Sequence, residues 1–538
     1  MEGTMKTATR ALLSVAILSM LGGCFDKEED TCAYWAPKVV QPAFTVRSIE
    51  KISELRCSEG LADLQTLFED GQFQKEILRT VKEVGDRDKG AGILRKGLLL
   101  GSTSKLSASI VQDWRLAAAR PELETILKTK NMPKNREVAL KALLSFTRPA
   151  TIEDLLLELA AEDPNLQDIA VNRMAVEELG KLRSVRAIPT VLRALFMTDQ
   201  AGKSIYQSAR QALGQIGASA IDPLVAVAEK KDAEFLKWSV DQGLQEWQWR
   251  MGPELTQALV DTLESRVAKT IVKLMSLPIA PPLGISDQMK EKWKNAQINR
   301  FTVSMTGIGS MPGEDAVEGL LSMVRDPLAD MVNQRMKSAS ALALIGSQSA
   351  VEGLLDTYEG KDKIFKDKDQ KTLYKEQRRL FEAPFMQPLT QALDYDSLPR
   401  FDKLVKKASE RVQASLKSDK VAGYLNVVRA CKKDAACYMQ KLKSKNRHEA
   451  IKAAVMLGRG IGDDAAVQKA LINAFLEAPK KDADLRRFPL VALLRRGTPA
   501  LGEELLKIAR NMGRGEDYWQ NELSSYGHWL ASKPAAKK

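Results

Sequence analysis

The chain has 538 residues and a net charge of +12, from 81 Lys and Arg against 69 Asp and Glu, and 44% of its residues are hydrophobic. This composition is typical of a folded protein with ample material for a core. Only two histidines are present, His448 and His528, which leaves little room for a His-based catalytic triad or a His-rich metal centre. Both are expected to be surface or packing residues.

The first segment, 1–23, has the order of a secretory signal. Lys6 and Arg10 precede an apolar run that begins at Ala11 and ends at Leu21, with Met5 as an alternative start. A helix needs about 20 apolar residues to cross a bilayer, and this run supplies about half of them. The pattern therefore predicts a cleaved export signal, with a short uncleaved anchor as the alternative.

The signal ends in Leu21-Gly22-Gly23-Cys24, followed by Phe25. This motif resembles the lipobox of bacterial lipoprotein precursors. The resemblance implies cleavage before Cys24, a diacylglyceryl group on its thiol and an acyl group such as palmitate on its amine. Two or more chains anchor a protein stably to a membrane. Because Phe25 and not Asp follows the cysteine, the outer membrane is favoured over the inner membrane.

Four further cysteines lie in two sequence neighbourhoods. An even number in an exported chain indicates disulfides, and proximity predicts the pairs Cys32–Cys57 and Cys431–Cys437. The first would staple the tether to the body, and the second would close a turn between two helices. The sequence has no Cys-x-x-Cys motif, and neither histidine lies at ligand spacing from the cysteines. A redox role and a metal role are therefore not favoured.

A repeated pattern begins after residue 130. Each copy has a small-and-apolar helix, then Leu or Ile followed by Gly, a turn, and an apolar second helix. Copies lie at 135–160, 171–196, 206–229, 301–324, 333–359, 448–475 and 486–509, the first without the glycine. Gly180 and Gly214 are 34 positions apart, a length that holds two helices. We expect these glycines to occupy the left-handed position that ends the first helix.

The pattern resembles the HEAT family of helical repeats. It implies an all-α fold, an α-solenoid of stacked antiparallel helix pairs, since one pair cannot bury both apolar faces alone. A generic helical bundle is the alternative. The predicted division is 1–23 signal peptide, 24–60 lipidated tether, 61–274 N-terminal HEAT-like array, 275–298 Pro-rich insertion, 299–360 HEAT-like repeats, 361–420 charged linker with degenerate helices, 421–530 C-terminal HEAT-like repeats and 531–538 basic tail.

Two features are candidates for binding a partner. Trp247 and Trp249 lie close together, and clustered tryptophans can anchor a protein, although core or cap positions are the alternative. The basic stretch 361–379 could form a ridge for an anionic partner, or a solvated linker helix with local ion pairs. Its candidate residues are Lys366, Lys368, Arg378 and Arg379.

The sequence contains no phosphate-binding Gly-rich loop, no Gly-x-Ser-x-Gly and no His-Glu-x-x-His. We therefore expect no enzymatic activity, no cofactor and no metal. The expected function is a membrane-tethered scaffold that binds a protein on the concave face of the solenoid. The alternatives are a structural envelope protein that binds anionic lipid or cell-wall polymer, and a HEAT-like lyase or enzyme accessory. Nucleic acid is not an expected partner of an exported chain.

Overall fold

The computed structural model describes residues 29–129, 133–277, 281, 283–326, 332–361 and 367–534. Over these residues the chain is helical and has no β-strand. None of the described helices combines the length and the hydropathy needed to cross a bilayer. The chain divides into two compact units, Met1–Ile152 with Glu162–Val171, and Glu153–Ala161 with Asn172–Lys538. The boundary thus lies near residue 160, whereas the sequence pattern indicated an interruption at 275–298.

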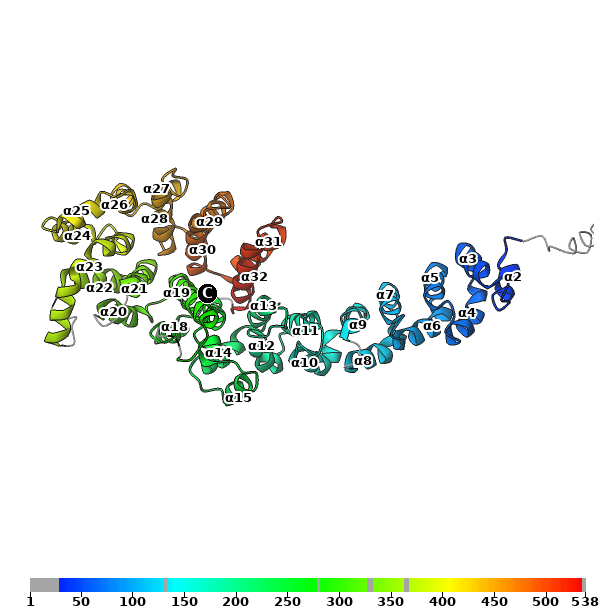
Figure 1. Ribbon diagram of the computed structural model, residues 1–538. Helices are drawn as coiled ribbons and strands as arrows, with labels where there is room; N and C mark the ends of the chain where they lie inside the picture. The colour runs from blue at the N-terminus through cyan, green and yellow to red at the C-terminus, as the bar shows by residue number, and fades with distance from the viewer. Residues whose placement is uncertain are drawn as a thin grey trace, which may run out of the picture. The chain divides into compact units, whose positions relative to one another are not determined.

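The first unit is built of two rows of helices (Figure 1). One row contains α3 (Thr45–Leu55), α5 (Gln74–Val84), α7 (Ser104–Trp114) and α9 (Pro133–Phe146), and the other contains α4 (Leu61–Glu69), α6 (Arg87–Leu99) and α8 (Arg120–Lys128). Each helix packs against the next in its own row. This arrangement is an α-solenoid.

The start of the described chain is part of this packing. The disulfide Cys32–Cys57 joins α2 (Cys32–Trp35) to the turn after α3, which confirms the predicted pair. Trp35 and Ile52 beside it are fully buried. From Cys32 onward, the segment expected as a tether is therefore a folded end of the first unit.

The second unit continues the same helix pairs. Its helices are α10 (Glu153–Ala161), α11 (Ile169–Lys181), α12 (Ile188–Ala194), α13 (Tyr206–Ile216), α14 (Ile221–Ala228), α15 (Ala233–Asp241), α16 (Glu246–Trp249), α17 (Pro253–Asp261), α18 (Ala268–Met275), α19 (Asp287–Ser310), α20 (Val317–Arg325), α21 (Val332–Ile345), α22 (Gln348–Glu359), α23 (Lys368–Ala392), α24 (Leu398–Val405), α25 (Glu410–Leu416), α26 (Asp419–Cys431), α27 (Ala435–Lys441), α28 (Arg447–Gly458), α29 (Asp464–Glu477), α30 (Ala483–Arg495), α31 (Pro499–Asn511) and α32 (Asp517–Ser532). The first residues of α11 belong to the first unit.

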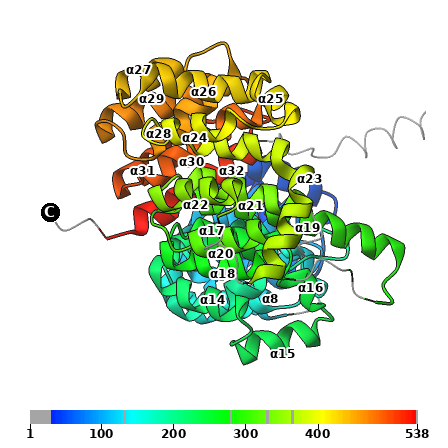
Figure 2. The ribbon, with the colours of Figure 1, turned by 90° about the vertical axis from the view of Figure 1, so that its left-hand side faces the viewer.

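One row of these helices runs through the second unit from α13 to α30, in the order α13, α17, α19, α21, α23, α26, α28 and α30. We call it the inner row. Figure 2 shows its later members α26, α28 and α30 following one another from the top of the view. The segment 361–420 was expected as a charged linker with degenerate helices. It supplies α23 to this row, with Phe385 and Leu389 fully buried.

The inner row closes on itself because the C-terminal helix α32 packs against α13, and α30 packs against α19. The closing contact holds a buried ion cluster, formed by Arg210 of α13, Asp261 of α17 and Glu522 of α32. The Arg210 guanidinium binds Asp261 through two hydrogen bonds of 2.7 and 2.8 Å, and Glu522 through one of 2.9 Å. Burial lowers the pKa of Arg210, but the two carboxylates outweigh it, and the pKa lies well above its ordinary value.

The repeat glycines allow these helices to approach one another. A Cβ on Gly180 would lie 2.6 Å from Cα of Ala212 on α13, and one on Gly309 would lie 2.5 Å from Cβ of Leu344 on α21. The expected left-handed conformation was wrong for both. It occurs at Gly346 (φ 56°), which follows α21 in the copy at 333–359. At Gly214 the neighbour is not the next helix in the row but His528 of α32, at 3.1 Å.

Inside the closed row, buried cations cover the carboxyl ends of α21 and α23. The Lys452 ammonium donates to the carbonyls of Gln391 and Leu393, each at 2.6 Å, and to that of Thr390 at 3.2 Å. Arg459 and Arg495 donate to other carbonyls at these two helix ends. Burial lowers the pKa of each arginine to about 10, so both stay charged at neutral pH and offset the partial negative charge of the helix ends.

Candidate functional site

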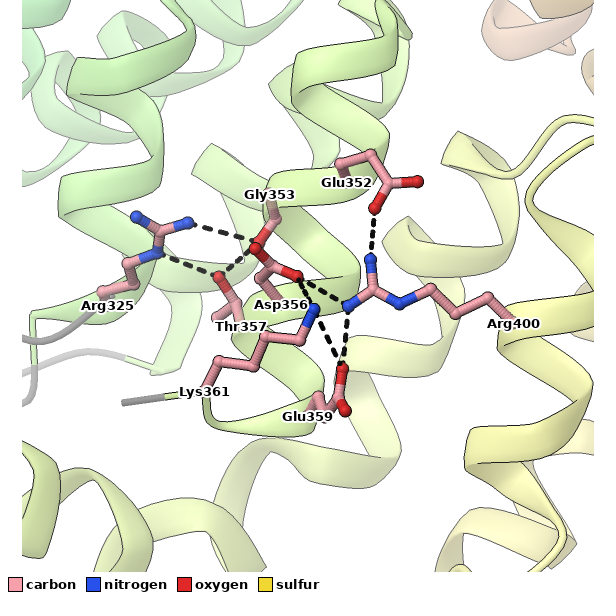
Figure 3. Close-up of polar contacts among 8 residues, drawn as sticks. All are labelled: Arg325, Glu352, Gly353, Asp356, Thr357, Glu359, Lys361 and Arg400. Atoms are coloured by element: carbon pink, nitrogen blue, oxygen red, sulfur yellow. Dashed lines mark hydrogen bonds and ion pairs between the residues drawn. The ribbon is translucent and has the colours of Figure 1, made fainter. Parts of the chain in front are cut away.

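A dense cluster of charged side chains joins the outer helices α20, α22 and α24, and its groups satisfy one another (Figure 3). Arg400 of α24 binds Asp356 at 2.6 Å and Glu359 at 2.8 Å, and also contacts Glu352. Lys361 binds Asp356 at 2.8 Å. Hydrogen bonding to Arg400 is the main cause of a lowered pKa at Glu359. Because its charges balance within the fold, we interpret this cluster as structural.

Replacing Arg400 with Met is expected to lower the free energy of unfolding of the second unit by about 1–2 kcal/mol, since three carboxylates lose a shared partner. The loss should shrink in high salt, which screens the repulsion among the remaining carboxylates. Urea unfolding at low and high ionic strength measures both effects. An equal loss at both salt concentrations would contradict the electrostatic explanation.

The second unit contains a pocket of about 790 Å³ between α27, α28, α29 and α30. We call it the C-terminal pocket, and Figure 2 shows the helices that form it in the upper part of the view. Its apolar lining is formed by Met439, Leu442, Ala450, Ile451, Ala466, Ala470, Ala474, Leu485 and Pro489. A hollow of this size and lining is typical of a site that takes an apolar segment of a ligand or partner.

Two local features of the sequence leave this space open. Ala466, Ala470 and Ala474 recur every four residues along α29, so they share one helix face and fill little volume. The opposing helix α27 ends after seven residues, half the length of α29. The predicted disulfide Cys431–Cys437 is present, and it joins α27 to the end of α26. It therefore holds one wall of the C-terminal pocket in place.

The rim of the C-terminal pocket carries an excess of positive charge. Lys443, Lys445 and Lys469 line it, together with the single acidic residue Glu477. None of these three lysines makes an ion pair with a residue that the structure describes. The pocket thus combines an apolar floor with unpaired ammonium groups, which favours an apolar segment that carries acidic groups.

The structure places the predicted binding residues elsewhere. Trp247 and Trp249 are buried, and Trp249 packs edge-on against Phe235, so neither is presented to a partner. Lys368 is exposed in the first turn of α23, whereas Arg378 lies over the ring of Tyr358 and pairs with Glu382. Lys368 and Arg378 therefore have different surroundings.

Three predicted positions lie outside what can be described. Cys24 and Lys366 are outside the described residues, and the side chain of Arg379 is outside them as well. The histidines are both partly buried: His448 lies at the first turn of α28, and His528 accepts or donates a hydrogen bond of 3.2 Å with Gln215. Burial lowers the pKa of His528 to about 4.

Sequence reasoning missed the C-terminal pocket, although a signal for it was present. That signal is the recurrence of alanine at positions 466, 470 and 474, which leaves one face of the helix with little side-chain volume. Within the described part of the chain, no group of three or more His, Cys, Asp or Glu residues is placed to hold a metal ion.

No protein-family model and no curated protein sequence matches this chain. Solved structures with a similar course include an engineered protein, with 14% identity over 82% of this chain and 98% of that chain, and a TM-score of 0.23. Another is Kap95p, whose binding induces the switch loops of RanGDP to adopt the GTP-bound conformation, with 12% identity over 93% of this chain and 67% of that chain, and a TM-score of 0.28. By its own helix pairs and rows, the chain is an α-solenoid of stacked helix pairs.

Proposed function

We propose that this protein is a scaffold, anchored to the bacterial cell envelope by lipid on Cys24, that binds a partner protein in the C-terminal pocket. The observation that carries the binding part is the apolar floor of that pocket with its rim of unpaired lysines. The motif Leu21-Gly22-Gly23-Cys24 carries the anchoring part. Binding at a concave face of the solenoid stays a prediction. In the second unit, α30 of the inner row packs against α19 of the same row.

The partner segment is expected to be apolar and flanked by acidic residues. Apolar contact with the alanine face of α29 supplies affinity, and Lys443, Lys445 and Lys469 supply orientation and a faster encounter. Because rim charges act mainly on the association rate, replacing the three lysines with Gln should slow association more than it speeds dissociation.

Filling the C-terminal pocket tests the binding part. A photo-crosslinking residue at Asn473 captures the partner in intact envelopes, and the Ala470→Trp replacement should abolish that capture. Ala465→Trp is the matched control, because Ala465 lies on the same helix but is exposed and does not line the pocket. Equal capture by both variants would exclude this pocket, and salt-sensitive binding to anionic vesicles alone would favour the structural envelope protein.

The Cys24→Ala replacement tests the anchoring part separately. We expect it to abolish labelling by a radioactive or alkyne fatty acid and to release the protein from the membrane fraction, because one thiol carries the lipid. A variant that keeps its fatty-acid label and stays in the membrane fraction would contradict the proposed anchor.

A further inference from the structure

A second hollow lies on the inner row of the second unit, and it shares Ile451 with the lining of the C-terminal pocket. It has a volume of about 180 Å³ and is lined by residues of six inner helices, α19, α21, α23, α26, α28 and α30. We call it the inner cavity. It is close in size to the cavity of about 150 Å³ that accommodates benzene in another protein. A small organic molecule fits this volume, whereas a peptide helix does not.

The inner cavity has one apolar side and one polar side. Met305, Leu344, Ile451 and Phe488 supply apolar surface. The polar groups of its lining are the hydroxyls of Ser340 and Tyr424, the amides of Gln387 and Gln391, and the charged or basic groups of Lys420, Arg447, His448 and Asp484. Such a wall with a few convergent polar groups is typical of a site for a small ligand.

Several of these polar groups have no partner. The side-chain amides of Gln387 and Gln391, one turn apart on α23, make no hydrogen bond with a described residue. Nδ1 of His448 is buried without a hydrogen bond. Lys420 makes no ion pair with any residue that the structure describes. Buried or half-buried polar groups usually have partners, so these groups are available to a ligand that enters the cavity.

One positive charge of the cavity lining is available to an anion. Arg447 binds Asp484 at 2.9 Å and Asp482 at 3.1 Å, so its own charge is neutralised within the fold. Burial is the main cause of a lowered pKa at His448, with Lys420 and Arg447 adding to it, so this ring is neutral at pH 7. Lys420 is then the one cationic lining residue that forms no direct ion pair with a described residue, and Asp484 acts on its ammonium from a longer distance.

The helix ends at the cavity act in the same direction. Lys420, Arg447 and Asp484 lie in the first turns of α26, α28 and α30. These three helices have 12 or 13 residues each, and their amino ends carry partial positive charge. Three such ends contribute residues to one cavity, but each already has an acidic residue in its first turn, so the lysine supplies the main attraction for a negative group.

We propose that the inner cavity binds a small monocarboxylate with a compact apolar body. The carboxylate pairs with the Lys420 ammonium and accepts hydrogen bonds from the amides of Gln387 and Gln391, and the apolar body contacts Leu344 and Phe488. This site shares Ile451 with the lining of the C-terminal pocket but has its own polar groups, and it does not depend on the proposed partner binding.

Calorimetric titration of the full-length protein with benzoate tests this proposal, with benzamide as the neutral probe of the same shape. We expect saturable binding of benzoate in the millimolar range or tighter, and at least about tenfold weaker binding of benzamide, because a hydrogen bond to a charged group contributes about 1.5–3 kcal/mol. Absence of saturable benzoate binding, or equal binding of both probes, would overturn the proposal.

Two lysine variants locate the site. Lys420→Met should weaken benzoate binding at least about tenfold, and Lys469→Met, which removes an ammonium at the C-terminal pocket, should leave it unchanged. Circular dichroism and the melting temperature check that each variant folds. If Lys420→Met does not fold, Gln391→Leu serves instead and should weaken benzoate binding. Loss of binding on Lys469→Met alone would place benzoate in the other pocket and overturn the assignment.

Discussion

Replacing Arg210 with Met is expected to lower the free energy of unfolding of the second unit by about 3–5 kcal/mol, since it leaves Asp261 and part of Glu522 buried without their cation. Asp261 is fully buried and Glu522 is 10% exposed at its side chain. Without Arg210, Asp261 keeps one described hydrogen bond, which it accepts from the Gln257 amide at 2.7 Å. Urea unfolding followed by tryptophan fluorescence, to which Trp519 and Trp529 of α32 contribute, measures the loss.

The control for this prediction is an exposed ion pair of similar length. Arg429 binds Asp402 at 2.7 Å, but both side chains are nearly half exposed. Arg429→Met should cost less than about 1 kcal/mol, because exposed pairs contribute little. If both variants lost the same small amount of unfolding free energy, the buried ion cluster around Arg210 would not stabilise the closing contact.

Replacing Gly214 with Leu should displace α32 from α13 and cost about 1–3 kcal/mol by overpacking. A Cβ alone would lie 3.1 Å from both Cβ of His528 and Cδ1 of Trp529, so the branched end of a leucine has no room. Hydrogen exchange should increase in α32 and much less in α3 to α9 of the first unit. Unchanged exchange in α32 would contradict this contact.

Gly513 provides the matched control. A Cβ at Gly513 would have no atom within 4 Å, and this residue lies shortly before α32. Gly513→Leu should therefore leave both the unfolding free energy and the exchange of α32 close to those of the natural chain. A loss equal to that of Gly214→Leu would show that added bulk near α32, rather than the closing contact, causes the effect.

The helix pairs could be predicted from the sequence because their signals are local. The copy at 206–229 becomes α13 and α14, the copy at 333–359 becomes α21 and α22, and the copy at 486–509 becomes α30 and α31. An apolar stripe, a turn and a second stripe specify such a pair without reference to the rest of the chain. Both disulfides followed from proximity in the same way.

Closure of the inner row could not be predicted, because it depends on contacts between distant segments. Arg210 and Glu522 are separated by 312 positions, and each reads in the sequence as an ordinary charged residue on a helix. The glycines show the same limit. A glycine near a helix end fits either a left-handed cap or a close helix contact, and only the position of the neighbouring helix decides between them.

The candidate sites were missed for a related reason. The C-terminal pocket exists because little side-chain volume lies beside α29. The helix α27 is short, and the side chains of α29 that line the pocket include three alanines. The inner cavity joins six helices spread over nearly 200 positions. Tryptophans and clusters of basic residues are conspicuous in a sequence, but Trp247 and Trp249 are core residues in the structure.

A double-mutant cycle between Arg210 and Glu522 tests closure of the second unit most directly. The variants are Arg210→Met, Glu522→Gln and the double replacement, with the free energy of unfolding measured for each. Residues in contact give interaction energies of about 0.5–3 kcal/mol, and we expect at least about 1 kcal/mol for this 2.9 Å pair. Additivity within about 0.3 kcal/mol would mean that α32 does not close the row on α13 in solution.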